Sequence, residues 1–172
     1  MKKLFITTLI TVSLIIALTA CTSKNNVRYL SKVLGINMSG GTIVEYTDTH
    51  GGFHGDGDTY IKVEFDDRTS KILLEDLNNN QNWSGLPLSD NLYAAVYGKE
   101  YDSIIIRALV QDADYKPIIP NIEKGYYYFY DRNSESKNVK DDTELFNRYS
   151  YNFTIAIYDT MNQVLYYYEL DT

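Results

Sequence analysis

Apolar and polar positions alternate most regularly in the C-terminal third of the chain. Every second residue from Tyr151 to Ile157 is apolar, and so is every second residue from Val164 to Leu170. A period of two residues is typical of a β-strand that is buried on at least one face. The segment 159–163 between the two runs contains turn-forming residues, so the pattern predicts a β-hairpin at the end of the chain.

Similar signals predict further strands upstream, at residues 29–38, 42–47, 59–65, 103–110 and 125–130. The run at 103–110 is apolar and β-branched, which favours a buried strand. Ser89 precedes an apolar run that ends at Gly98, so a short capped helix is expected there. Residues 69–78 are ambiguous: their apolar spacing fits a helix that Asp66 or Asp67 could cap. The expected fold is therefore α+β and mainly β, a single antiparallel sheet with short helices and a C-terminal β-hairpin.

The N-terminus has the features of an export signal. Lys2 and Lys3 are followed by an uncharged apolar run from Leu4 to Leu18, which is 15 residues long. A helix that crosses a bilayer needs about 20 apolar residues. The short run and its positive flank predict a signal peptide over residues 1–20.

The residues Leu18-Thr19-Ala20-Cys21 resemble the lipobox of bacterial prolipoproteins. The resemblance implies cleavage before Cys21 and a diacylglycerol on its thiol, which would anchor the protein at the extracytoplasmic face of the cell membrane. Two or more acyl chains hold a protein stably on a bilayer. Cys21 is the only cysteine, and lipidation would remove a lone reactive thiol. The alternatives are an ordinary signal peptide with an unrelated cysteine and an uncleaved anchor.

Composition limits the classes of function. Residues 21–27 would form the lipidated N-terminus and a short linker, and residues 28–172 one globular domain. The two lysines before Cys21 have no acidic counterpart, so residues 21–172 hold 14 basic and 23 acidic side chains and a net charge of −9. Such a surface repels nucleic acid, which is not an expected partner.

Four segments of the mature chain form a recognisable set. They are DTHGGFHGDG at 48–57, LPLS at 86–89, PNIEKGYY at 120–127 and FTIAIYD at 153–159. Together they resemble small uncharacterised exported lipoproteins of low-GC Gram-positive bacteria. The resemblance implies an extracytoplasmic location and a single domain, and it implies no activity and no catalytic residue.

Both histidines lie in one glycine-rich loop. His50 and His54 lie within ten residues of Asp48, Asp56 and Asp58. Two imidazoles and a carboxylate can bind zinc or another first-row divalent metal. The spacing matches neither the His-Glu-x-x-His motif nor an EF-hand. The alternatives are a polar turn whose side chains cap backbone amides, and acid–base catalysis.

Tyrosine is unusually frequent, with 17 residues, ten of them between Tyr126 and Tyr168. Tyrosine combines a rigid apolar ring with a polar tip, which suits recognition of sugars or proteins. The candidates for such a surface are Phe53, Trp83, Tyr127 and Tyr167. The alternative is that tyrosine, a good strand former, fills the core.

The leading interpretation is a non-enzymatic envelope lipoprotein that binds a protein or a cell-wall component. Nucleophilic catalysis is disfavoured, since there is no Gly-x-Ser-x-Gly motif and the one cysteine is the expected lipid site. The second interpretation is a metal-binding or metal-dependent hydrolytic lipoprotein that uses His50 and His54. No cofactor is expected apart from the divalent metal of that second interpretation.

Overall fold

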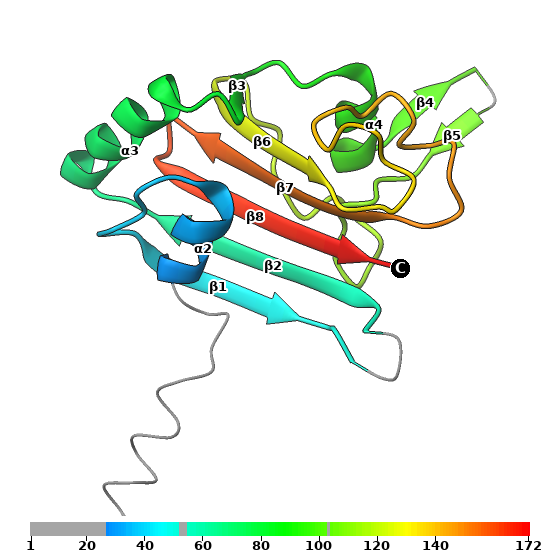
Figure 1. Ribbon diagram of the computed structural model, residues 1–172, viewed down its shortest axis with the longest axis horizontal. Helices are drawn as coiled ribbons and strands as arrows, with labels where there is room; N and C mark the ends of the chain where they lie inside the picture. The colour runs from blue at the N-terminus through cyan, green and yellow to red at the C-terminus, as the bar shows by residue number, and fades with distance from the viewer. Residues whose placement is uncertain (1–26, 52–54, 103) are drawn as a thin grey trace, which may run out of the picture.

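The computed structural model describes residues 27–51, 55–102 and 104–172. It contains a six-stranded antiparallel sheet of order β1-β2-β8-β7-β6-β3 and a separate two-stranded hairpin (Figure 1). The expected class, mainly antiparallel β with short helices and a C-terminal hairpin, is confirmed. The strands are β1 (Thr42–Asp48), β2 (Gly57–Glu64), β3 (Trp83–Gly85), β4 (Lys99–Tyr101), β5 (Ile104–Ile106), β6 (Gly125–Asp131), β7 (Asn152–Asp159) and β8 (Val164–Asp171). The helices are α2 (Val27–Leu34), α3 (Asp67–Asn79) and α4 (Asp90–Tyr97).

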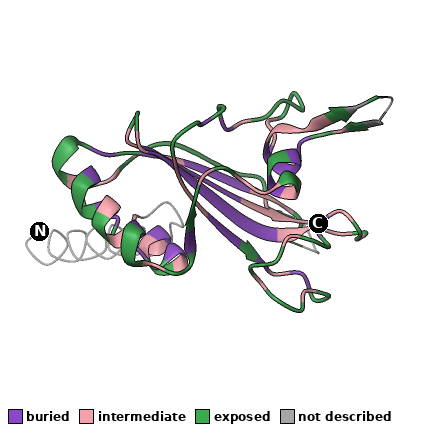
Figure 2. Ribbon diagram, turned by 90° about the horizontal axis from the view of Figure 1, so that it is seen from above, coloured by how far each residue is buried: buried purple, intermediate pink, exposed green. Residues whose placement is uncertain are grey.

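The C-terminal hairpin, β7 and β8, lies at the centre of the sheet. Its turn is fixed by Asp159, whose Oδ1 accepts hydrogen bonds from the amides of Met161 at 2.8 Å and Asn162 at 3.1 Å. Residues 153–159 and 164–168 are all buried, because both faces of these strands are covered (Figure 2). The sheet therefore separates two apolar clusters.

Helices α2 and α3 cover one face of the sheet. Leu30 and Leu34 of α2 pack with residues of α3 and with the inner face of β2, β7 and β8 in one cluster. The expected strand at 29–38 is wrong. Val27, Leu30 and Leu34 recur at helical spacing, and Gly35, with a φ of 65°, ends the helix.

Helix α4 and the segment 107–122 cover the opposite face. The amides of Leu109 and Val110 both donate to the carbonyl of Ala95 in α4, at 2.7 and 3.0 Å. The expected buried strand at 103–110 is also wrong. Among the described strands, β5 pairs only with β4, in a hairpin that stands out from the body (Figure 1), and Ile105 is 71% exposed.

Capping residues set the helix starts. The Asp66 carboxylate accepts from the Thr69 amide at 2.8 Å, and the Ser89 hydroxyl accepts from the Leu92 amide at 3.1 Å. The ambiguous segment 69–78 is thereby helical, and the expected helix between Ser89 and Gly98 is confirmed. Within the described residues, no helix has the length and apolar character that crossing a bilayer requires.

Candidate functional site

A groove of about 540 Å³ lies where β1, β2 and β8 meet the segment 109–118. It opens on the α4 side of the sheet, since its floor residues Tyr60, Tyr168 and Leu170 belong to the apolar cluster of that side. Leu109 and Ile118 form the opposite wall. Volumes of about 300–1,000 Å³ are usual for pockets that take small ligands. A second hollow, of about 310 Å³, is lined by one polar loop at 135–148.

Strand register builds the floor of the groove. Thr47 pairs with Tyr60, and Tyr60 pairs with Tyr168, so the three residues lie side by side across β1, β2 and β8. Paired residues on neighbouring strands point to the same face of a sheet. Tyr60 and Tyr168 are almost fully buried. They give the floor aromatic rings, and the partly buried Tyr151 also lines the groove.

The rim of the groove is acidic. Glu45, Asp58 and Asp112 line it, and no lysine, arginine or histidine is among the described residues that do. Lys62 is the register partner of Glu45, but its Nζ lies 3.4 Å from a Glu64 carboxylate oxygen. Two of the three acids have structural contacts as well, whereas the Glu45 side chain makes no hydrogen bond or ion pair with the described residues.

Asp58 joins the groove to the loop before β2. The Thr49 hydroxyl donates to its carboxylate, and the Asp58 amide donates to that hydroxyl at 2.8 Å. Burial, followed by the charge of Asp58, raises the pKa of the Tyr168 hydroxyl. That hydroxyl therefore stays protonated and donates to the backbone carbonyl of Gln111 at 3.5 Å.

Two neighbouring residues complete the polar part of the opposite wall. Asp112 Oδ1 accepts from the amides of Asp114 and Lys116, each at 2.9 Å, which fixes the turn. The Gln111 side-chain oxygen is buried and accepts no hydrogen bond from the described residues. A buried acceptor without a donor is costly, so this atom favours a hydrogen-bond donor in the groove.

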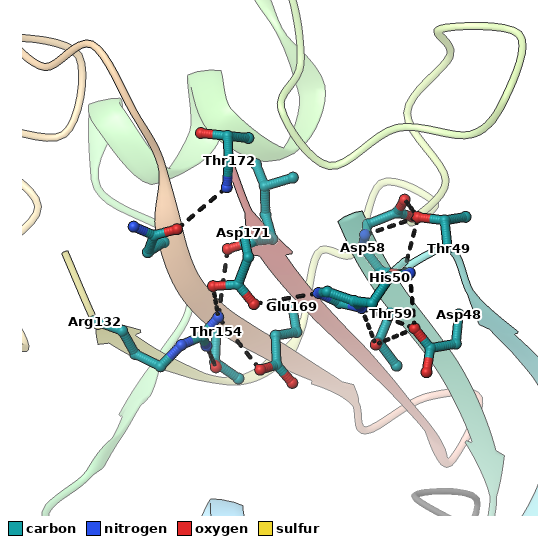
Figure 3. Close-up of polar contacts among 12 residues, drawn as sticks. Asp48, Thr49, His50, Asp58, Thr59, Arg132, Thr154, Glu169, Asp171 and Thr172 are labelled. Atoms are coloured by element: carbon teal, nitrogen blue, oxygen red, sulfur yellow. Dashed lines mark hydrogen bonds and ion pairs between the residues drawn. The ribbon is translucent and has the colours of Figure 1, made fainter. Parts of the chain in front are cut away.

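The histidine loop lies at the other face of the same sheet edge. His50 is held between two carboxylates: its Nδ1 lies 2.8 Å from Asp48 Oδ1, and its Nε2 lies 3.2 Å from Asp171 Oδ2 (Figure 3). The Thr59 hydroxyl lies 3.2 Å from Nδ1. The ring is 15% exposed. These contacts tie the end of β1 to the end of β8 across β2.

The row of polar contacts continues from Asp171 to Arg132. Arg132 Nη2 lies 2.7 Å from Asp171 Oδ1 and 3.3 Å from Glu169 Oε1, and Nη1 donates to the Thr154 hydroxyl (Figure 3). The Tyr167 hydroxyl donates to Glu169 Oε2 at 2.7 Å. Acids and bases are paired along this row, which is the arrangement of a structural network that fixes strand register.

The predicted metal ligands are not brought together among the described residues. Asp48 contacts His50, but Asp58 contacts Thr49 and lines the groove on the opposite face. Asp56 is exposed, and His54 lies outside the described residues. The described residues contain no group of three or more His, Cys, Asp or Glu side chains that could hold a metal ion. A metal at His50 would have to displace a carboxylate contact.

The described residues of the predicted aromatic surface lie in the two apolar clusters or pack against them. Trp83 begins β3; it is buried, and its Nε1 donates to the Leu34 carbonyl at 3.0 Å. Tyr167 is fully buried. Burial removes both residues from any exposed recognition surface. Tyr127 is partly buried and packs beside the cluster on the α4 side. Phe53 and Cys21 lie outside the described residues.

Sequence reasoning missed the groove residues. Glu45 and Thr47 are ordinary exposed-strand residues in the sequence, and Gln111 follows a run that was expected to be a buried strand. The available signal was the alternation of β2, which puts Tyr60 on one face and Ile61 on the other. It does not reveal which distant segment covers that face.

Comparison with protein-family models, with curated proteins and with solved structures finds no match to this chain. What the groove binds must therefore follow from its own shape and chemistry.

Proposed function

We propose that this protein is a lipid-anchored, extracytoplasmic binding module that takes a small ligand into the groove between the β1-β2-β8 edge of the sheet and the segment 109–118. It acts by binding and performs no chemistry on the ligand. The observation that carries the proposal is the groove itself, a concavity of about 540 Å³ with an aromatic floor and a polar rim. Sites for small molecules usually combine an apolar floor with a few polar groups.

The contacts of His50 favour binding over hydrolysis. Both ring nitrogens face carboxylates on the sheet face opposite the groove, so His50 lines no part of the groove. The described groove residues include Thr47, Thr49 and Thr172 as hydroxyl groups, but no histidine to act as their base. A hydroxyl nucleophile needs a base beside it, and histidine is the usual one.

A lipid on Cys21 would leave the groove accessible. Five residues separate Cys21 from Val27, the first residue of α2, so the helix would lie within about 20 Å of the anchor. Helix α2 packs on one face of the sheet, and the groove opens on the other. The bilayer would then be nearest the α2 side, with the groove on the far side of the sheet.

The binding part is tested with a groove-filling substitution. Thr47→Trp would place an indole in the groove, and Thr42→Trp makes the same exchange at another exposed position of β1 that does not line the groove. The protein, purified from membranes into nanodiscs, is screened by ligand-observed NMR against small amines, carboxylates, neutral sugars and short peptides. Binding that Thr47→Trp abolishes and Thr42→Trp retains supports the proposal. A screen in which no compound shows this pattern contradicts it.

The anchor is tested separately. Intact-mass spectrometry of the membrane fraction should show a chain that begins at Cys21 and carries a diacylglycerol. Cys21→Ser should release the protein from the membrane or leave it unprocessed. An unmodified, full-length chain with a free thiol on Cys21 would disprove the lipid anchor without bearing on the groove.

A further inference from the structure

The charged side chains among the described lining residues of the groove are all negative. Its charged lining residues are Glu45, Asp58 and Asp112, and no basic side chain is among its described lining residues. The whole chain has a net charge of −7, so the wider field adds to this local excess of negative charge. An anionic ligand would meet like charges on both scales, and a cationic ligand would be attracted by both.

Two hydrogen-bond acceptors without a partner among the described residues also favour a cationic ligand. Gln111 contributes a buried side-chain oxygen that receives no hydrogen bond from the described residues. Glu45 has a carboxylate with no ion-pair partner among them, since the nearby Lys62 pairs with Glu64 at 3.4 Å. Glu45 offers only acceptors, and the Gln111 side-chain oxygen is an acceptor that receives no hydrogen bond from the described residues. The complementary ligand group is therefore a donor. An ammonium group carries three donors and no acceptor.

The floor adds a requirement for a carbon-rich body. Tyr60 and Tyr168 lie side by side, with Leu170 next to them and Ile118 across the groove. Aromatic faces also attract organic cations, which strengthens the preference for a charged amine over a neutral apolar compound.

We propose that the ligand of the groove is a small organic ammonium ion, with its charged end at the acidic rim and its carbon-rich body on the tyrosine floor. This inference rests on the proposed function, because it names the class of ligand that the same groove takes. Glu45 is the residue that selects the charge, since Asp58 and Asp112 also hold the Thr49 loop and the 112–116 turn.

The test uses three probes with one carbon skeleton and three charges: phenylbutylamine, phenylbutanol and phenylbutyrate. Isothermal titration calorimetry on the nanodisc-held protein should show the amine binding at least about tenfold tighter than the alcohol, and the carboxylate weakest. Raising the ionic strength should weaken the amine and leave the alcohol unchanged, because only the charged ligand is screened.

Variants of Glu45 test whether this residue determines the preference of the groove for a cation. Glu45→Gln should weaken the amine by about tenfold with little change for the alcohol. Glu45→Lys should reverse the order of amine and carboxylate. Glu75→Gln, the same change of charge on the exposed side of α3, should leave all three affinities unchanged. Because Glu45 is exposed and makes no side-chain hydrogen bond within the described residues, neither variant is expected to impair folding.

Each contrary outcome would overturn a different statement about the groove. Equal binding of amine and alcohol, both abolished by Thr47→Trp, would overturn the cation inference and leave the binding groove standing. Amine binding that Glu45→Lys does not change would overturn the role of Glu45 and the rim. Failure of all three probes would overturn the inference, while the proposed function would still be judged by the wider screen with Thr47→Trp and Thr42→Trp.

Discussion

The backbone of His50 passes directly over Gly57. A Cβ atom on residue 57 would lie 2.6 Å from both the backbone nitrogen and the Cα of His50. The missing side chain lets the loop fold back across the first residue of β2. It thereby brings the His50 ring within 3.2 Å of Asp171 on β8, across the strand that separates them.

Gly57→Ala should therefore lower the free energy of unfolding by about 1–3 kcal/mol, the usual cost of overpacking. The atoms that the new methyl group meets are backbone atoms, which cannot turn aside as a side chain can. Gly51→Ala is the control in the same loop, because the nearest atom to an added Cβ there is 3.9 Å away. Urea unfolding of the two variants measures the difference. Equal free energies of unfolding for the two variants would show that the close approach of the His50 backbone to Gly57 does not affect stability.

A buried ion pair fixes the long loop after β6. Arg148 Nη1 lies 2.6 Å from Asp131 Oδ2, and the two side chains are 6% and 1% exposed. Removing one partner of a buried pair leaves an uncompensated charge and costs about 3–5 kcal/mol. We expect Arg148→Met to destabilise the protein by an amount in this range, measured by urea unfolding.

The matched control is Lys62→Met, which breaks the more exposed pair with Glu64. Exposed pairs contribute about 0–1 kcal/mol, because water and salt screen them. The double variant Arg148→Met/Asp131→Asn should recover part of the lost stability, since no unpaired charge remains. A cost for Arg148→Met no larger than that for Lys62→Met would contradict the assignment of this pair as buried.

The buried tyrosines predict a limit to stability at high pH. Burial is the main cause that raises the pKa of the Tyr97, Tyr128 and Tyr158 hydroxyls above the ordinary value of 10.0. The folded state thus favours the neutral form. The resulting stability is fully present below about pH 10 and is lost as the pH rises through the raised folded values.

We therefore expect the part of the tyrosinate absorbance that comes from these three residues to rise late and together with unfolding, whereas in urea they should titrate near the ordinary value of about 10. Absorbance and far-ultraviolet circular dichroism, followed on the same samples, measure the two processes. If the absorbance shows that all tyrosines have ionised while the circular dichroism still reports a folded protein, the burial of these hydroxyls would be contradicted.

Local signals were sufficient for much of the fold. The alternation in residues 151–157 and 164–170 predicts the central hairpin, and Ser89 with Gly98 predicts α4. These local signals gave wrong predictions where contacts between distant segments determine the structure. Residues 29–38 contain apolar residues that fit either period, and packing on the sheet selects the helix. Residues 107–110 leave the hairpin to pack on α4, which no local pattern indicates.

The site was less predictable than the fold. The histidine loop has an unusual composition, yet each ring nitrogen of His50 lies against a carboxylate, one of them 121 residues away in the chain. The groove depends on β1 and β2, which follow each other in the chain, on the distant strand β8, and on a segment with no distinctive motif. Its members become a set only when the register Thr47–Tyr60–Tyr168 is known.

His50→Ala separates a structural role for the histidine loop from a metal site. The substitution removes the contacts to Asp48 and Asp171, so we expect a loss of about 1 kcal/mol in stability. Hydrogen exchange should speed up at the amides of Thr49 and Asp58, which close the end of the β1-β2 pair.

Elemental mass spectrometry tests the metal site. After incubation with zinc, manganese and calcium, it should find no stoichiometric metal in either the wild type or the variant His50→Ala/His54→Ala, because each ring nitrogen of His50 already faces a carboxylate. Near-stoichiometric metal in the wild type that disappears in the double variant would contradict the structural role and make the loop a metal site.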